Sequence, residues 1–133
     1  YYSAISFYIA ANDSINQRVL CYVPLEIISI NAYVNLYYSI LFSTRYILSK
    51  FNTEFSSDEN ISGLFDKLPK EIKKDLTKCC RIEFCTLKNL DLKNLDGYAE
   101  NLHEVFKEVQ LLFPFARKLR LVVQNMHQNI FYW

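Results

Sequence analysis

A metal ion could be bound by residues in the second half of the chain: Cys79, Cys80, Cys85 and His103. Thiolate and imidazole groups are the usual ligands of a structural Zn²⁺ ion. The spacing does not follow a paired C-x-x-C arrangement, and adjacent cysteines rarely both reach one tetrahedral ion. We therefore expect no metal site, and we interpret the cysteines as small buried hydrophobic side chains.

Nucleophilic catalysis would need a base beside a cysteine or serine, and the chain holds two histidines, His103 and His127. Neither histidine lies in a recognisable catalytic motif. The two glycines, Gly63 and Gly97, are too few for phosphate-binding loops or glycine-flanked nucleophile turns. We expect no enzymatic activity and no cofactor, and a helical enzyme built round one histidine is kept only as an alternative hypothesis.

The formal net charge is +1, so no overall electrostatic field attracts nucleic acid. The run "KLPKEIKKDLTK" is typical of a solvated helix face, although a basic patch for nucleic acid or an acidic partner stays open. Adjacent cysteines without a preceding secretory segment fit a reducing compartment. The chain starts at Tyr1 without methionine, and we interpret it as a fragment of a larger protein.

The composition predicts an all-α protein, a helical bundle with minor extended segments. Hydrophobic residues make up 51% of the 133 residues, which is enough for the core of one domain. Glycine and proline are scarce, and sheets need glycine for tight turns whereas helices do not. Residues 1–11 predict a short helix or the end of a longer one. Residues 17–28 predict a short extended segment that runs into Pro24.

A long buried helix is predicted from about Asn31 to Phe51. Its apolar stripe follows the helical period and comprises Ala32, Tyr33, Leu36, Tyr37, Ile40, Leu41, Ile47 and Phe51. Polar residues interrupt the stripe too often for a membrane span, so we expect none. Residues 52–63 then form a polar break in which Gly63 is expected to stop a helix.

Two further helices are predicted in the second half. The first starts near Pro69 with Glu71 in its first turn, and it places Ile72 and Leu76 on the core. Residues 86–98 are interpreted as a connector. The second spans 96–113, with its apolar side made by Leu102, Val105, Phe106, Val109, Leu112 and Phe113. Pro114 is expected to break or kink it, so that a closing helix begins at about Phe115.

The closing helix carries two stripes. Its core stripe is predicted to comprise Leu119, Val122, Val123, Met126, Ile130 and Trp133. A second stripe holds amides and guanidinium groups beside Phe131, which is either an ordinary solvent-facing side or a surface for a partner protein. We take its polar members, with Lys118, as candidate partner-binding residues: Arg117, Lys118, Arg120, Gln124, His127 and Gln128.

Two segments carry a resemblance to a known family. In residues 18–48, an extended stretch with an aromatic residue leads into Pro-Leu, a hydrophobic run and a helix; the matching residues are Tyr22, Pro24, Leu25, Ile27, Ile28, Tyr37, Ile40, Leu41 and Arg45. In residues 116–133, basic residues lead into a Val-Gln-Asn-like core through Arg117, Lys118, Leu119, Val122, Val123, Gln124, Asn125 and Met126. Together they resemble the gamma-tubulin complex component family, also called the spindle pole body component family. The family's tryptophans flanking the first segment are absent.

The resemblance implies that residues 1–133 are part of the C-terminal gamma-tubulin-binding helical domain, with 52–113 a divergent or inserted segment. It implies a scaffold without catalysis that supports microtubule nucleation. The implied partners are gamma-tubulin and other gamma-tubulin complex components. The implied location is the cytoplasm and cytoskeleton, at the microtubule-organising centre or spindle pole. A generic helical adaptor of another cytosolic assembly is the alternative.

Overall fold

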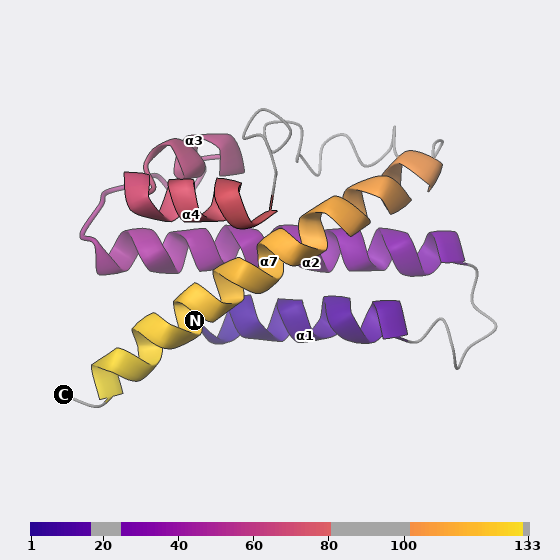
Figure 1. Cartoon of the computed structure of the whole chain (residues 1–133), viewed down its shortest axis with the longest axis horizontal. Helices are drawn as coiled ribbons and strands as arrows, with labels where there is room; N and C mark the ends of the chain where they lie inside the picture. The colour runs from indigo at the N-terminus through magenta and orange to yellow at the C-terminus, as the bar shows by residue number, and fades with distance from the viewer. Residues whose placement is uncertain (17–24, 81–101, 132–133) are drawn as a thin grey trace.

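The computed structural model describes residues 1–16, 25–80 and 102–131 (Figure 1). These residues form five helices and no strand: α1 (Tyr2–Asn16), α2 (Leu25–Lys50), α3 (Ile61–Asp66), α4 (Lys70–Cys80) and α7 (Leu102–Phe131). The prediction of an all-α bundle is confirmed. The predicted helix in residues 1–11 is present as α1. Part of the predicted extended segment is wrong, because Leu25–Ile28 lie in the first turn of α2; residues 17–24 lie outside the described ranges.

The three long helices make the body of the bundle. Helices α1 and α2 run side by side in opposite directions, and α7 crosses both of them diagonally (Figure 1). Helices α3 and α4 lie along the C-terminal half of α2, where α3 contacts α2 and α4 contacts α7. Because α2 contacts α1, α3 and α7, it is the central element of the fold.

The predicted stripe of α2 forms the middle of the core. Ala32, Tyr33, Leu36, Ile40 and Ile47 are fully buried, and Leu41 is nearly so. Tyr37 is only partly buried. The prediction for Phe51 is wrong: α2 ends at Lys50, and the Phe51 side chain is 51% exposed. Helical spacing therefore identified the buried side correctly as far as the helix continues.

Polar side chains are also buried along α2. Ser39 donates a hydrogen bond from Oγ to the carbonyl oxygen of Ala4 in α1, at 2.9 Å. Thr44 donates to the carbonyl oxygen of Ile40 one turn earlier, at 2.7 Å. Ser43 Oγ is buried and has no hydrogen-bond partner among the described residues. The hydroxyl of Ser39 thus links α1 to α2, whereas that of Ser43 is unsatisfied.

The C-terminus of α2 is closed by Asn52, which adopts a left-handed conformation with a φ of 53°. This geometry lets the amide of Thr53 donate to the carbonyl oxygen of Leu48 at 3.0 Å, the long hydrogen bond of a Schellman motif. Asparagine is the residue other than glycine that takes this conformation most readily. The polar break predicted after the long helix therefore begins with a specific capping turn.

A short helix follows that the sequence interpretation did not include. Helix α3 begins after Asn60, whose side chain accepts a hydrogen bond from the amide of Gly63. Gly63 thus lies in the first turn of a helix, and its predicted role as a helix stop is wrong. Helix α4 starts directly after Pro69 with Glu71 in its first turn, as predicted, and it buries Leu76 while Ile72 is partly buried.

Helix α7 is continuous across Pro114, so a break at this residue and a separate helix from Phe115 are wrong, and a kink there stays a prediction. Pro114 lies on the exposed side of the helix. The opposite side is buried over its whole length, through Val105, Val109, Leu112, Phe115, Ala116, Leu119 and Val123. Val122 and Met126 contact this core from its edge, while Ile130 and Trp133 have no described side chain. None of the helices in the described ranges is long and apolar enough to cross a membrane.

Candidate functional site

Five of the candidate partner-binding residues share one flank of α7 beside its buried side, whereas the helical period places Lys118 on the opposite flank. Arg117 and Gln128 are exposed, whereas Lys118, Arg120, Gln124 and His127 are partly buried. The sequence could not distinguish the partly buried residues of this set from the exposed ones, because the burial of each side chain depends on which helix lies opposite α7. For Arg120 that helix is α1, and for His127 it includes α2.

Arg120 points toward α1. Its guanidinium carbon lies 4.6 Å from the centroid of the Tyr8 ring, a cation–π geometry. One guanidinium nitrogen donates to Gln124 Oε1 at 3.1 Å, one helical turn further on. The Nε atom of Arg120 is buried and has no hydrogen-bond partner in the described part of the chain. Arg120 and Gln124 therefore form a pair that contacts α1 and has one unused donor.

His127 connects three helices at the far end of α7. Its ring stacks on Tyr1 with centroids 3.7 Å apart and planes 13° apart. Its Nδ1 atom lies 3.3 Å from the hydroxyl of Tyr46 in α2. Burial, and secondarily the neighbouring Tyr1, raise the pKa of Tyr46 above its ordinary value, so this hydroxyl keeps its proton at neutral pH. The Lys50 ammonium lies 5.2 Å from the centroid of the Tyr46 ring. This histidine is thus an internal aromatic contact.

An open hollow of about 400 Å³ lies on the outer side of α1. Its described lining is mostly apolar and comprises Tyr1, Tyr2, Ile5, Ser6 and Ile9. Tyr2 and Ile9 are 78% and 53% exposed, so two large side chains of this lining face solvent. Sequence interpretation missed this surface, although the density of aromatic and aliphatic residues in "YYSAISFYIAA" signals more apolar side chains than one buried face can cover.

Tyr1 belongs both to the hollow and to the stack on His127. The amide and guanidinium flank of α7 and the apolar side of α1 are therefore neighbouring surfaces. Such a combination is suited to binding another protein, because apolar side chains contribute affinity and amide or guanidinium groups give orientation.

The described ranges do not bring metal-ligating side chains together. No cluster of three or more His, Cys, Asp or Glu side chains there could hold a metal ion. The side chains of Cys79, Cys80, Cys85 and His103 are not among those described. The chain matches no protein-family model, and comparisons with curated proteins and with solved structures also give no match.

Proposed function

We propose that the chain is part of a gamma-tubulin-binding scaffold domain, in a gamma-tubulin complex component that supports microtubule nucleation. The observation that carries the proposal is the contact between α2 and α7. These helices contain most of the two segments, 18–48 and 116–133, on which the family resemblance rests. A functional unit made from both segments requires them to lie together, and their contact supports this reading.

The proposed role is mechanical and needs neither catalysis nor a cofactor. A stack of packed helices holds a partner at a fixed angle, and nucleation depends on holding several tubulins in a fixed arrangement. The proposed location is the cytoskeleton, at a microtubule-organising centre or spindle pole. Other components of the complex are proposed as further partners.

Within the candidate stripe, the side chains that point outward are proposed to contact gamma-tubulin directly. These are Arg117 and Gln128, which are exposed, with Lys118 at the opposite edge of the helix. Arg120 and His127 are proposed to hold α7 against α1 and so to set the direction in which the outward side chains point.

The test is co-purification of gamma-tubulin with the full-length protein carrying both Arg117→Glu and Gln128→Glu. We expect the recovered gamma-tubulin to fall by about tenfold or more, because the reversed charge acts at an interface. The control is Lys74→Glu on the exposed side of α4, which reverses one cation as Arg117→Glu does and should leave recovery unchanged. Full recovery with the folded double variant would remove this stripe from the interface.

The alternative, a helical adaptor for another protein, is distinguished by the unmodified full-length protein. If it co-purifies with a different partner and with no gamma-tubulin, the proposed function is wrong. The exposed side chains of Leu111 and Leu121 on α7 would then be the first candidates for the adaptor surface, being 53% and 41% exposed.

A further inference from the structure

The connection between α2 and α3 presents a polar, accessible segment. Ser56, Ser57 and Asp58 are exposed, and they lie in irregular backbone between the cap of α2 and the start of α3. Glu59 follows directly and is partly buried. A serine in such backbone can be drawn into an extended conformation by an enzyme without unfolding a helix.

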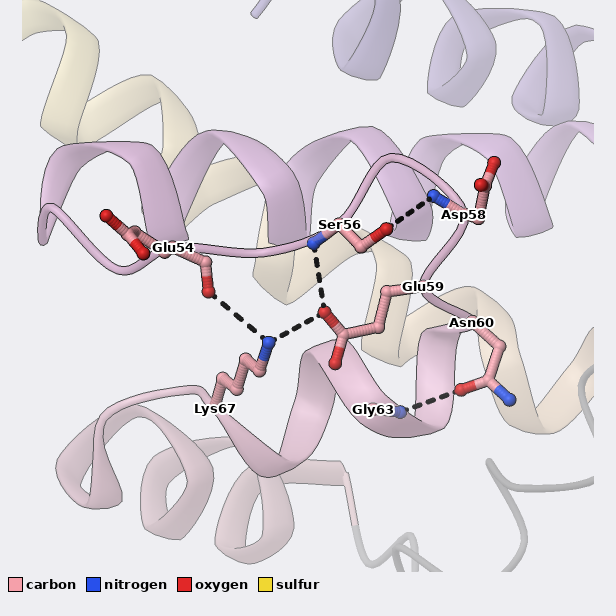
Figure 2. Close-up of polar contacts among 7 residues, drawn as sticks. All are labelled: Glu54, Ser56, Asp58, Glu59, Asn60, Gly63 and Lys67. Carbon is pink, nitrogen blue, oxygen red and sulfur yellow. Dashed lines mark hydrogen bonds and ion pairs between the residues drawn. The ribbon is translucent and has the colours of Figure 1, made fainter.

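Lys67 holds this connection from the side of α3. Its ammonium group lies 2.7 Å from Glu59 Oε2 and donates to the carbonyl oxygen of Glu54 at 3.3 Å (Figure 2). The same carboxylate oxygen accepts from the amide of Ser56 at 3.3 Å. Gly63 leaves room for this carboxylate, because a Cβ atom there would lie 2.8 Å from Glu59 Oε1. Ser56 is therefore close to a cation that remains accessible to solvent while it is paired with Glu59.

Arg45 holds the connection from the side of α2. It donates from a guanidinium nitrogen to the carbonyl oxygen of Ser57 at 2.8 Å. Its Nε atom is buried and has no hydrogen-bond partner among the residues that the structure describes. A second cation with an unused donor thus lies against the residue that follows Ser56.

We propose that Ser56 is a phosphorylation site for a serine kinase with a basic substrate groove, and that Lys67 and Arg45 bind the resulting phosphate. Asp58 and Glu59 stand two and three residues after Ser56, and two successive carboxylates complement a basic groove. The other exposed serines of the described ranges outside this connection have no acid in the next three positions: Ser3, Ser6 and Ser49.

The reaction is a phosphoryl transfer from ATP. The Ser56 Oγ atom bonds to the γ-phosphorus, the bond from that phosphorus to the β,γ-bridging oxygen breaks, and ADP leaves. The hydroxyl proton passes to the base of the kinase. Releasing the segment into the groove breaks the Lys67–Glu59 pair, which water screens and which is therefore weak.

The phosphate changes which groups Lys67 binds. It carries a charge of about −1.5 to −2 at neutral pH, more than the single charge of the Glu59 carboxylate. Lys67 then binds the phosphate in place of Glu59, while the two like charges repel each other. The segment loses its contact through Glu59 and gains two stronger contacts, from the phosphate to Lys67 and to Arg45. The kinase therefore controls how the segment is attached to α2 and α3.

The first test is incubation of the full-length protein with ATP and a purified acid-directed serine kinase, followed by fragmentation mass spectrometry. We expect one phosphate on Ser56, lost in Ser56→Ala and retained in the matched variant Ser57→Ala. The rate should fall by about tenfold in Glu59→Gln, which removes one complementary charge. A phosphate mapped to Ser57 instead, or none on the folded protein, would overturn the assignment.

The second test follows the phosphate by ³¹P NMR. A phosphoserine titrates with a second pKa of about 6, and neighbouring cations lower that pKa because they stabilise the dianion. We expect a lowered value in the phosphorylated protein and a return toward 6 in Lys67→Met, but not in the control Lys74→Met. If the phosphate titrates identically in the parent, in Lys67→Met and in urea, the proposed binding by Lys67 is wrong.

Discussion

The guanidinium group of Arg120 lies over the ring of Tyr8, with 4.6 Å between its central carbon and the ring centroid. This contact joins α7 to α1, which are the last and the first helices of the described residues. It also means that a residue interpreted as a surface cation contributes first to the packing of the bundle.

Replacing Arg120 by alanine should therefore lower the stability of the fold. A partly desolvated cation–π contact contributes about 0.5–2 kcal/mol, and the variant also removes the hydrogen bond to Gln124. We expect a loss of about 1–2 kcal/mol in the free energy of unfolding, measured by urea denaturation. Arg117→Ala on the same helix is exposed and should change it by no more than about 0.5 kcal/mol. Equal losses would show that the contact with Tyr8 is not stabilising.

Two serines one turn apart in α2 should respond in opposite ways. Ser39→Ala removes the buried hydrogen bond to Ala4 and should cost about 1 kcal/mol of unfolding free energy. Ser43→Ala removes a buried hydroxyl that has no partner in the described ranges, so the change should be neutral or stabilising. Thermal denaturation of the two variants under the same conditions gives the comparison. A larger loss for Ser43→Ala would contradict the hydrogen-bonding arrangement described for α2.

Glu59 should titrate below its ordinary pKa. The hydrogen bond from Lys67, with a smaller contribution from the amide of Ser56, lowers the pKa of this carboxyl from 4.5. The folded form then binds its proton less readily than the unfolded form. The resulting stabilisation is present above pH 4.5 and is lost as the pH falls through the lower folded-state pKa. Carbon-detected NMR titration of the Glu59 carboxyl should show the lowered midpoint, and Lys67→Met should raise it; an unchanged midpoint in that variant would contradict the assignment of the cause.

Pro114 lies in the interior of α7 and should lower the stability of this helix. Pro114 has no amide hydrogen to donate to the preceding turn, and its ring lies on the exposed side, where no packing compensates for the loss. We expect Pro114→Ala to stabilise the protein by about 1–3 kcal/mol, seen as a higher midpoint of thermal unfolding.

Pro69 supplies the control for this variant. It precedes the first residue of α4, where its carbonyl oxygen accepts the first helical hydrogen bond from Lys73 at 3.0 Å. A proline at a helix start forfeits no internal hydrogen bond, so Pro69→Ala should give no comparable gain. If Pro114→Ala destabilises the fold, the backbone geometry imposed by Pro114 is needed to place the two halves of α7.

The interior of the fold was largely predictable because it depends on local spacing. The buried positions of α2, such as Leu36 and Ile40, follow the helical period and are buried as predicted. Errors occurred where a local signal competes with tertiary packing. Pro114 signals a helix break, yet α7 continues because its buried side contacts the core on both sides of the proline. Gly63 signals a stop, yet Asn60 three residues before it caps a new helix.

The candidate site was predictable only in its residue types. Helical spacing placed Arg117, Arg120 and His127 on one flank of α7, but it could not supply the aromatic residues that lie opposite. Tyr8 lies in α1 and Tyr1 directly before it, more than a hundred residues earlier in the sequence. Whether a polar side chain points to solvent or to another helix is decided by that long-range arrangement, which no local pattern contains.

The position of α2 between α1 and α7 has a consequence for synthesis on the ribosome. Residues 17–24 alone separate α1 from α2, whereas residues 51–101 separate α2 from α7. The short connection closes at a lower entropic cost, so the α1–α2 hairpin forms while α7 is still untranslated. Until α7 emerges, the side of α2 that it covers stays open to water and to chaperones. Nascent chains that stall before residue 102 should therefore be bound by chaperones more strongly than completed ones.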